Sequence, residues 1–577
     1  RVRLNILSVD LPYGDGMNLR YAREGETPEQ LIARLRCNVW RVVGHEYQLD
    51  SLDYNISPDA SENSPGCNFG EWTWQLNRHE EWIPVALHFQ RTGDPRAMEA
   101  ICSWIRTWVE TCPPPTEEFN TELTSWRTIE IGIRLGGVWP QIFHIAKHSD
   151  ILDDQLLLAW LNSVAEQCDF AWRHRKTRNW LMMEMNGLLT AALMFPFFKS
   201  APSWRVNALN VYIEEIDKQF LPDGMQVELS ASYHGVSFKQ YLRAYRLLQI
   251  AGEDIPEEFL PGMRKMLEPW RAMVRPNGQV FGFQDDDGVD YPSWLRQLPQ
   301  ELLHPEDAFF TKGTPAPVLL NNLLPYAGQG VLRTGWTQKD TAVAIDVGPF
   351  GAAHQHEDKL SIQVWSRGKN LVGEAGKVNY SDSPQRNYSL TSLAHSTAIV
   401  DGCGQNSRRV YQNSDVVSEK PAKNIECNLE GSPPWIKGVY EDGYGVDGGI
   451  GVTHQRTVIL NSPTLITLRD RFCAHDEQAH IVEILFHLLT ESYEITQTGA
   501  RSTGRGPNVS IVARTTGAEP FSVSGACGGS YPDLRGWAAM DKADYKGSND
   551  LVPRPCITIT ARMERCIEMV TEITILS

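Results

Sequence analysis

The first half of the chain carries hydrophobic residues that recur at helical spacing. From about Glu29 to Leu298, apolar positions return every three or four residues, as in EEWIPVALHFQRTGD, RAMEAICSWIRTWVETC and LLLAWLNSVAEQCDFAWRH. Short breaks rich in Pro, Gly and Asp separate these segments. Such spacing puts the apolar side chains on one helix face, so the pattern predicts roughly a dozen amphipathic helices joined as hairpins. These helices must close on themselves or form a solenoid, and no repeated residue signature supports a solenoid.

After LLPYAGQG the periodicity changes to two. TAVAIDVG, LSIQVWSRG, TLITLRDRF and NVSIVART alternate apolar with polar residues between Gly or Asn turns, which is typical of strands. A single large open sheet would leave an apolar face in water, so two packed antiparallel sheets are favoured. The sequence therefore predicts a helical domain over residues 1–320 and a β-sandwich over 324–577, with a subdivision near residue 500 left open.

Length and composition describe an ordinary globular chain. With 577 residues it can bury several cores, and 42% hydrophobic and 22% charged residues are typical of soluble proteins. No segment approaches ~20 consecutive apolar residues, so we expect no membrane span. The chain opens RVRLNILSVD, without Met or an apolar signal core. This opening indicates a leader that was removed or left out, and we expect a periplasmic or secreted protein.

Net charge and cysteine usage narrow the function classes. The formal charge of -17 argues against a nucleic-acid partner, which requires a basic face. A basic cleft can still coexist with this charge, so arginines near candidate catalytic residues matter more than the sum. The eleven cysteines are scattered without a CxxC pair, which favours buried or free thiols over a zinc-thiolate site or a disulfide framework. The composition leaves the oligomeric state open.

The stretch GPFGAAHQHEDKLSIQVW places two histidines two positions apart. We predict an extended strand here, and since residues i and i+2 of a strand share a face, His354 and His356 should point the same way. They could then bind a metal, serve catalysis or be held by ordinary hydrogen bonds. The residues alone leave these alternatives open.

Five segments together resemble a known family. RNWLMMEMNGLLTAALMFP, DGMQVELSASYH, HQHEDKLS, LVGEAGKVNY and RNYSLTSLAHSTAIVDG are similar, in this order, to the motifs of the heparinase II/III-like polysaccharide lyases. The resemblance implies an incomplete (α/α) toroid joined to a β-sandwich, and cleavage of an acidic polysaccharide by β-elimination. Named members act on heparin, heparan sulfate, alginate, hyaluronan or chondroitin, so the resemblance defines the reaction class better than the substrate.

β-Elimination beside a uronic acid needs a group that neutralises the carboxylate, a base for the C5 proton and an acid for the leaving oxygen. The resemblance assigns the first role to Asn179, although an asparagine there could simply cap a helix. It assigns the acid to Tyr233, which is also the base for one C5 epimer, and the base for the opposite face to His354. Trp180 stands where the family often has histidine. A phenol with a pKa near ~10 needs nearby positive charge to act as a base.

The resemblance also implies a structural divalent metal. Its ligands would be His356, Glu374 and His395, with Glu374 in place of the family's aspartate. Two imidazoles and a carboxylate, completed by water, suit zinc. The longer glutamate leaves manganese or calcium open, although two nitrogen ligands disfavour calcium.

Further candidates for substrate binding follow from chemistry and approximate motif position. Arg127, Glu130 and Arg134 have helical spacing on one face, where arginine could bind a carboxylate or sulfate. Buried ion pairs between helices are the alternative. Tryptophans offer stacking surfaces for sugars, and Glu184 and Glu228 could orient Asn179 or Tyr233. The remaining candidates are Asn77, Arg78, His79, Trp126, His234, Tyr380, Arg386 and Tyr388.

Three other functions compete with a glycosaminoglycan lyase. Alginate is an alternative substrate, but Arg78, Arg127, Arg134 and Arg386 favour a glycosaminoglycan. The acidic cluster GFQDDDG, with Asp285 to Asp287, raises the alternative of a toroid glycoside hydrolase with paired carboxylates. The eighteen tryptophans raise that of a non-catalytic carbohydrate-binding protein.

Overall fold

The computed structural model describes residues 21–42, 45–55, 69–115, 125–147, 149–313, 316–378, 383–406, 422–517, 519–530, 533–539 and 551–576. Its contacts divide the chain into two compact units. Of the described residues, unit 1 comprises those in 21–216 and 236–259, and unit 2 comprises those in 217–235, 260–539 and 551–576. These boundaries fall within helices and at the start of one, whereas the sequence prediction placed a single domain boundary near residue 320. The segment before Tyr233 thereby groups with the β-sheets.

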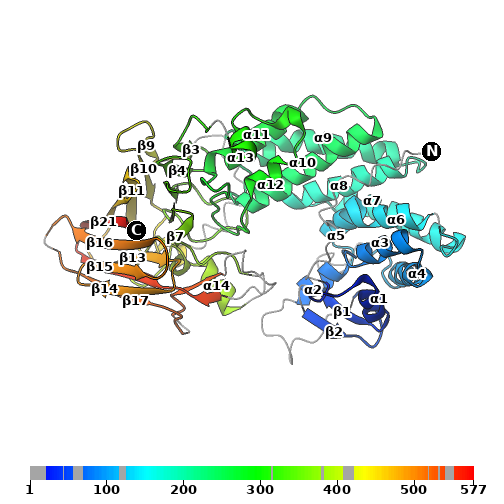
Figure 1. Ribbon diagram of the computed structural model, residues 1–577, viewed down its shortest axis with the longest axis horizontal. Coiled ribbons are helices and arrows are strands. Elements are labelled where there is room, and N and C mark those ends of the chain that lie inside the picture. The colour runs from blue at the N-terminus through cyan, green and yellow to red at the C-terminus, as the bar shows by residue number, and fades with distance from the viewer. Residues whose placement is uncertain are drawn as a thin grey trace. The chain divides into compact units, whose positions relative to one another are not determined.

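Unit 1 is helical, and its helices run from blue to green in Figure 1. Side chains explain several of the starts: Asp94 accepts from Arg96 N at 3.0 Å ahead of Pro95, and Asp153 accepts from Leu156 N at 2.7 Å. The helices are α1 (Pro28–Arg36), α2 (Phe69–Leu76), α3 (Trp82–Thr92), α4 (Pro95–Thr111), α5 (Thr128–Ile133), α6 (Trp139–Ala146), α7 (Asp154–His174), α8 (Arg178–Met194), α9 (Ala201–Gln219) and α10 (Ala231–Ala251), with a hairpin of β1 (Val39–Val42) and β2 (His45–Gln48). Every helical segment quoted from the sequence is confirmed.

Glycines bring α5 close to α8, the helix that begins beside Asn179. A Cβ on Gly132 would lie 2.6 Å from Met183 O, and one on Gly187 would lie 3.0 Å from Gly132 Cα. Only glycine permits this approach. A π-helical turn, η3 (Arg134–Val138), lies between α5 and α6.

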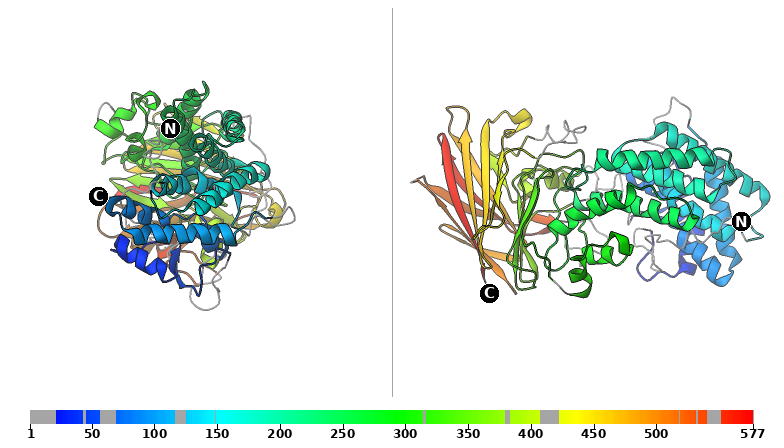
Figure 2. Two further views of the ribbon diagram at one scale, coloured as in Figure 1. Left: turned by 90° about the vertical axis from the view of Figure 1, so that its right-hand side faces the viewer. Right: turned by 90° about the horizontal axis from the view of Figure 1, so that it is seen from above.

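Unit 2 contains two antiparallel sheets, and the right-hand view of Figure 2 shows β3 to β7 in green beside strands in yellow to red. One sheet has the order β14-β15-β16-β21-β12-β11-β10-β9, and the other has the order β17-β20-β13-β7-β6-β5-β4-β3 with β8 paired to β13. The strands are β3 (Asn322–Leu324), β4 (Gln329–Arg333), β5 (Thr341–Asp346), β6 (Ile362–Ser366), β7 (Lys369–Gly373), β8 (Ala398–Val400), β9 (Glu426–Asn428), β10 (Trp435–Tyr440), β11 (Val452–Ser462), β12 (Leu465–Ala474), β13 (His480–Leu488), β14 (Ser492–Thr496), β15 (Gly499–Thr503), β16 (Asn508–Thr515), β17 (Phe521–Ala526), β20 (Cys556–Met563) and β21 (Cys566–Leu576), and β18 (Trp537–Ala539) pairs with β19 (Leu551–Pro553).

One hydrophobic core joins the two sheets. Ile345 of β5 and Ile484 of β13 belong to the same buried cluster as Val458 of β11 and Ile573 of β21. Strand β11 alternates buried with half-buried residues, as expected for a sheet with one face on the core. The predicted β-sandwich is confirmed.

Short helices of unit 2 pack beside the first strands. Arg333, at the end of β4, is 2% exposed and donates to Ala272 O at 2.6 Å and Val274 O at 2.9 Å, at the C-terminus of α11 (Phe259–Met273). A cation here also complements the helix dipole. The other helices are α12 (Tyr291–Leu295), η4 (Gln300–Leu302), α13 (Asp307–Lys312), α14 (Pro384–Leu390), η5 (Ser392–Ala394) and η6 (Val446–Gly448).

The cysteines depart from the sequence prediction at one pair. Cys473 and Cys566 face each other across β12 and β21, with Cα atoms 4.2 Å apart, and form a disulfide. Eight further cysteines in the described parts of the chain are free thiols. Separately, no described helix is both long and apolar enough to cross a membrane.

Candidate active site

Tyr233 and His354 lie face to face within unit 2. Their ring centroids are 3.6 Å apart and the ring planes are inclined by 15°. Tyr233 is the third residue of α10, and His354 lies in the loop between β5 and β6. Both side chains are partly exposed. The structure thus brings together two predicted catalytic residues that are far apart in the sequence.

Backbone contacts explain why these two segments meet. The β5–β6 loop docks on the segment before α10: Ala352 N donates to Val227 O at 2.9 Å, and Gln355 Nε2 donates to Glu228 O at 2.7 Å. A Cβ on Gly351 would lie 2.7 Å from Val227 O, so the GPFGAAHQH motif needs glycine at this position. The start of α10 is held by Asp286 Oδ1, which accepts from Ser232 N at 2.9 Å.

The two histidines of the HxH motif converge, but not as a strand. His354 has a left-handed φ of 58° and the whole motif is loop, so the prediction of an extended strand was wrong. Their common neighbour is the Asp285 carboxylate, which lies 3.1 Å from His354 Nδ1 and 3.0 Å from His356 Nε2. Arg386 of α14 donates to the same carboxylate at 2.5 and 2.8 Å. One buried aspartate therefore holds two histidines and an arginine.

The hydrogen bonds to Asp285 determine its protonation state. Burial alone would raise its pKa, but hydrogen bonds from His354, His356 and Arg386 hold the pKa well below its usual range. The carboxylate is therefore ionised and accepts a hydrogen bond from His354 Nδ1–H. In the neutral ring the lone pair then lies on Nε2, which is 3.9 Å from Glu228 Oε2, beyond hydrogen-bonding distance.

Lys377 is a further cation at this site. Its Nζ lies 5.6 Å from the centroid of the Tyr233 ring and 2.8 Å from Asp287 Oδ2. Positive charge near a phenol favours the phenolate. Sequence analysis missed Lys377, although it lies just after Glu374 in the LVGEAGKVNY motif.

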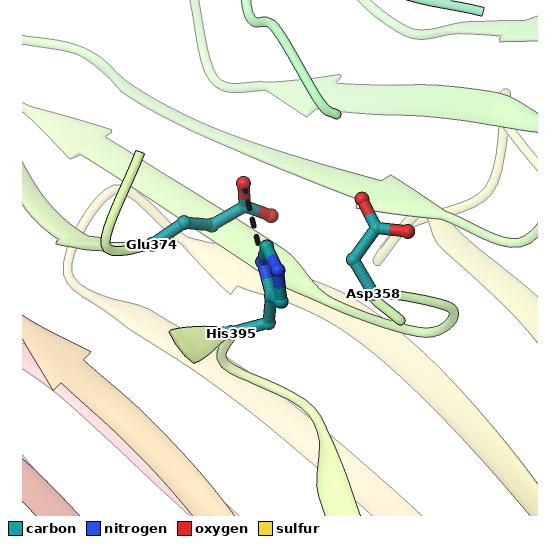
Figure 3. Close-up of side chains that lie close together, drawn as sticks. All are labelled: Asp358, Glu374 and His395. Atoms are coloured by element: carbon teal, nitrogen blue, oxygen red, sulfur yellow. Dashed lines mark ion pairs between the residues drawn. The ribbon is translucent and has the colours of Figure 1, made fainter. Parts of the chain in front are cut away.

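Asp358, Glu374 and His395 form a candidate metal centre beside this site. Each offers a ligand atom within 4.8 Å of the others, and Figure 3 shows both carboxylates near the His395 ring. Asp358 comes from the β5–β6 loop, Glu374 follows β7 and His395 follows η5. His395 Nδ1 lies 3.5 Å from Glu374 Oε2.

This cluster shares Glu374 and His395 with the predicted ligand set and adds Asp358. The predicted ligand His356 is not part of the cluster, and its Nε2 lies 3.0 Å from Asp285 Oδ1. Within the described residues, Asp358 Oδ2, His395 Nδ1 and His356 Nδ1 are buried without a hydrogen-bond partner. Unsatisfied carboxylate and imidazole atoms fit a divalent cation. The His356 and His395 rings are 5.2 Å apart.

A buried polar network supports both groups of residues. Gln284 Nε2 donates to Asp358 Oδ1 at 2.9 Å and to Asp346 Oδ2 at 3.1 Å, and its Oε1 accepts from His356 N at 2.7 Å. Lys359 Nζ lies 2.5 Å from Asp346 Oδ2 and balances part of this charge. All five residues are buried. Gln284 and Asp285 together connect the metal cluster with His354.

Unit 1 contains the third predicted catalytic residue. Asn179 is the second residue of α8 and is 5% exposed. The N-cap of this helix is Thr177, so Asn179 does not cap it. The turn before it is held by Glu184, whose Oε2 accepts from Lys176 N at 3.0 Å. Burial raises the pKa of Glu184 to about 7.

An arginine cluster lies in the same unit. The Arg127 guanidinium stacks on Trp74 and Trp180, 3.8 and 4.2 Å from their ring centroids. Glu130 Oε1 lies 3.4 Å from Arg127 and 3.0 Å from Arg78. Trp180, the residue that replaces the family's histidine, therefore packs on an arginine. Arg78 and Arg127 each retain partial exposure, which keeps them as candidates for substrate binding.

Four other candidates in unit 1 are buried, so we revise their assignment to helix packing. Arg134 is 0% exposed and donates to Asn77 O at 2.6 Å. Trp126 is covered and donates to Cys112 O at 2.9 Å, so its ring offers no face to a sugar. Asn77 is buried among backbone carbonyls, and His79 accepts from Trp139 Nε1 at 2.9 Å. Burial holds the pKa of His79 well below its usual value.

Two of the substrate-binding candidates in unit 2 are also buried. His234 is buried with Nε2 2.6 Å from Met266 O, and burial lowers its pKa to about 4. Tyr388 donates to Trp537 O at 3.3 Å, and burial raises the pKa of its hydroxyl. Neither side chain can contact a polysaccharide in this conformation. Tyr380 lies outside the described residues.

A helical toroid followed by an antiparallel sandwich, with a tyrosine and a histidine stacked at an interior carboxylate, defines the class of fold and site. The family descriptions "Heparinase II/III N-terminus" and "Heparinase II/III-like, C-terminal" match residues 39–309 and 318–534. The chain belongs to the heparinase II/III-like superfamily, as its motifs predicted.

Individual relatives agree with this membership. A heparin-sulfate lyase of Pedobacter heparinus is 27% identical over 57% of this chain and 52% of its own length. One of Bacteroides thetaiotaomicron is 26% identical over 57% of this chain and 51% of its own. The match therefore spans about half the length of these curated relatives. A crystal structure of heparinase III superposes over 99% of this chain and 88% of its own, with a TM-score of 0.78 and 19% identity, and confirms the fold.

Proposed function

We propose that the protein is a polysaccharide lyase that cleaves a glycosaminoglycan by β-elimination and leaves an unsaturated uronyl end. The observation that carries this proposal is the Tyr233–His354 stack with His354 Nδ1 on Asp285. It presents a phenol stacked on an imidazole, and these groups can supply the acid and the base that elimination requires. The heparin-sulfate lyase relatives support the reaction class.

Each residue has a distinct task in this proposal. Tyr233 gives its proton to the leaving O4, and it removes the C5 proton when that proton lies on its own side of the sugar. His354 takes the proton through Nε2 when the uronic acid is the other C5 epimer. Asn179 donates a hydrogen bond to the substrate carboxylate and stabilises the enolate-like intermediate. Its role rests on the motif and on its position at the start of α8.

The three aspartates that raised the glycoside hydrolase alternative all make contacts within the protein. Asp285 is occupied by two histidines and Arg386. Asp286 accepts from Ser232, and Asp287 pairs with Lys377. A hydrolase needs two carboxyl groups that face each other across the sugar, and these three are engaged in holding the protein together.

A glycosaminoglycan substrate is proposed from the relatives and from two of the four candidate arginines. Arg134 is buried and Arg386 is paired with Asp285, so these two arginines no longer support the inference of a sulfated substrate. Arg78 and Arg127 remain, and the relatives are named for heparin sulfate. Incubation with heparan sulfate, chondroitin, hyaluronan and alginate, followed by ultraviolet absorbance of the new double bond, tests this choice. Activity on alginate alone would overturn it.

We propose that Asp358, Glu374 and His395 hold a structural divalent metal, with zinc favoured by the nitrogen ligand. Bound there, the ion would neutralise two carboxylates and tie together the β5–β6 loop and the segments after β7 and η5. The β5–β6 loop also carries His354, so we expect the site to stabilise the active conformation. Elemental analysis of the purified protein identifies the metal, and a stoichiometry near zero would reject the site.

We also propose a periplasmic or secreted location. The Cys473–Cys566 disulfide supports it, because such bonds persist in oxidising compartments. Mass spectrometry after thiol blocking, on protein prepared from its native host, tests the proposal. Reduced Cys473 and Cys566 there would contradict it.

A further inference from the structure

We propose that Asp285 is a positioning residue for the elimination, and that it holds His354 in the one ring orientation and tautomer that direct the Nε2 lone pair to the substrate. This inference rests on the proposed lyase function. Asp285 belongs to the acidic QDDDG cluster, whose sequence pointed to hydrolytic carboxylates. Its side chain is 0% exposed, so it acts through His354 and not on the sugar.

The contacts of Asp285 leave His354 little freedom. A carboxylate has about four acceptor sites, and Asp285 uses them for His354 Nδ1, His356 Nε2 and both terminal nitrogens of Arg386. The Asp285 amide also donates to the His354 carbonyl at 3.2 Å. The imidazole is thus fixed by its edge on Asp285 and by its face on Tyr233.

The backbone at this contact supports a functional role. Gln284 and His354 both adopt left-handed conformations, with φ of 68° and 58°. Residues other than glycine pay strain in this region, and such strain is typical of functional sites whose surroundings hold it. Here the strain lies on both sides of the Asp285–His354 contact.

Arg386 balances the negative charge of Asp285. It was predicted to bind substrate, but both of its terminal nitrogens are on Asp285. The bidentate pair balances the aspartate charge, so the carboxylate can accept from His354 without requiring a second positive charge. A neutral His354 with Nδ1–H is the form that a base needs.

The test uses Asp285→Asn in the full chain. Asparagine has the same shape, but its amide offers two N–H donors where Arg386 and a histidine present donors of their own. We expect kcat to fall by at least about 10-fold, the lower end of the effect typical when the hydrogen-bonding partner of a metal-bound histidine is removed, while KM changes little. The loss should be greatest on the C5 epimer that depends on His354. Combination with His354→Gln should add no further loss on that epimer.

Asp307→Asn is the matched control. Asp307 is also buried, is bound by Arg271 through two nitrogens at 3.0 and 3.1 Å, and accepts from Tyr291 at 2.8 Å. None of its partners belongs to the candidate site. We expect a comparable loss of thermal stability with kcat unchanged. Equal kcat losses in both variants would show that Asp285 is merely structural and overturn the proposal.

A second measurement does not depend on activity. Nitrogen NMR of isotope-labelled histidines, with His354→Gln to assign the resonance, reports which nitrogen of the neutral ring carries the proton. We expect Nδ1–H for His354 in the unaltered protein, whether or not Asp285→Asn folds, and a mixture of tautomers in that variant. An Nε2–H tautomer in the unaltered protein would overturn the inference. Absence of unsaturated product together with Nδ1–H would instead reject the lyase function and retain the contact.

Discussion

The imidazole of His354 lies on the phenol ring of Tyr233, with centroids 3.6 Å apart and planes inclined by 15°. This stack brings the DGMQVELSASYH and HQHEDKLS motifs together at the candidate active site. Both rings are partly exposed, whereas Asp285 and His356 behind them are buried. The two candidate catalytic side chains are therefore backed by a buried polar layer.

Replacement of Tyr233 by Phe should abolish most of the chemistry and leave the fold intact. The ring still stacks on His354, but the proton for O4 is gone. We expect turnover to fall at least ~100-fold, the lower range for a positioned acid–base group, with thermal unfolding unchanged. The measurement is the initial rate of double-bond formation. Tyr241→Phe is the control, because Tyr241 is a buried tyrosine of the same helix that donates to Tyr212 O at 2.9 Å. Equal rates for the two variants would show that Tyr233 is not the proton carrier.

Replacement of His354 by Gln should discriminate between C5 epimers. Tyr233 remains to serve substrates whose C5 proton lies on its side, so turnover should fall most on the opposite epimer, by about 100-fold or more. Rates on polymers enriched in glucuronic or in iduronic acid give the comparison. A uniform loss on both would mean that His354 positions Tyr233 and does not act as a base.

The effect of replacing Asn179 on turnover should depend on the charge of the new side chain. Alanine removes the hydrogen bond to the substrate carboxylate, and we expect kcat to fall by about 100-fold, as when an oxyanion donor is removed. Aspartate keeps the shape but repels the substrate, so it should be worse than alanine and should also raise KM. If Asn179→Asp retained more activity than Asn179→Ala, the assignment to carboxylate binding would be wrong.

The sequence predicted elements well because burial sets their periodicity. The helices up to α11 and strands such as β11 and β16 follow from which face is apolar. The predicted HxH strand failed because loop conformation leaves no periodic signal. Asp285 contacts His354 across 69 positions, and no local pattern reveals such a pairing. The same reason explains why Asp358 was missed as a candidate metal ligand and why Cys473 was not paired with Cys566.

The sequence also did not reveal which polar and charged side chains are buried. Arginine is mostly exposed in proteins and histidine is intermediate, yet Arg134 and His79 are both fully buried. The alternative of ion pairs and packing between helices described this region better than a substrate-binding face. Partial exposure of Arg78 and Arg127 is what keeps those two as candidates.

Glu184 should make stability depend on pH. Burial raises its pKa from 4.5 to about 7, so between these values the folded state keeps a proton that the unfolded state has lost. Stability from this group therefore falls as pH rises through that window. Glu184→Gln removes the effect, and its melting temperature relative to the unaltered protein should increase with pH. The difference should reach on the order of 3 kcal/mol in the free energy of unfolding, since one pKa unit is about 1.4 kcal/mol. The exposed Glu257 provides the control, Glu257→Gln. A pH-independent difference for Glu184→Gln would contradict this origin.

Removal of the metal should act on stability before chemistry. A chelator should lower the melting temperature and reduce activity slowly and partially, because the Asp358, Glu374 and His395 cluster includes neither Tyr233 nor His354. Glu374→Gln should reproduce both effects and lower the metal content. Immediate and total loss, restored at once by added metal, would instead indicate direct participation in the reaction.

The central claim is that this chain breaks a glycosidic linkage by elimination at Tyr233. The most direct measurement is the ultraviolet absorbance of heparan sulfate digested by the unaltered protein and by Tyr233→Phe, with reducing ends counted in parallel. The account predicts that absorbance and reducing ends rise together with the unaltered protein, and that both nearly stop with Tyr233→Phe. New reducing ends without the absorbance of a conjugated double bond would show hydrolysis and contradict the account.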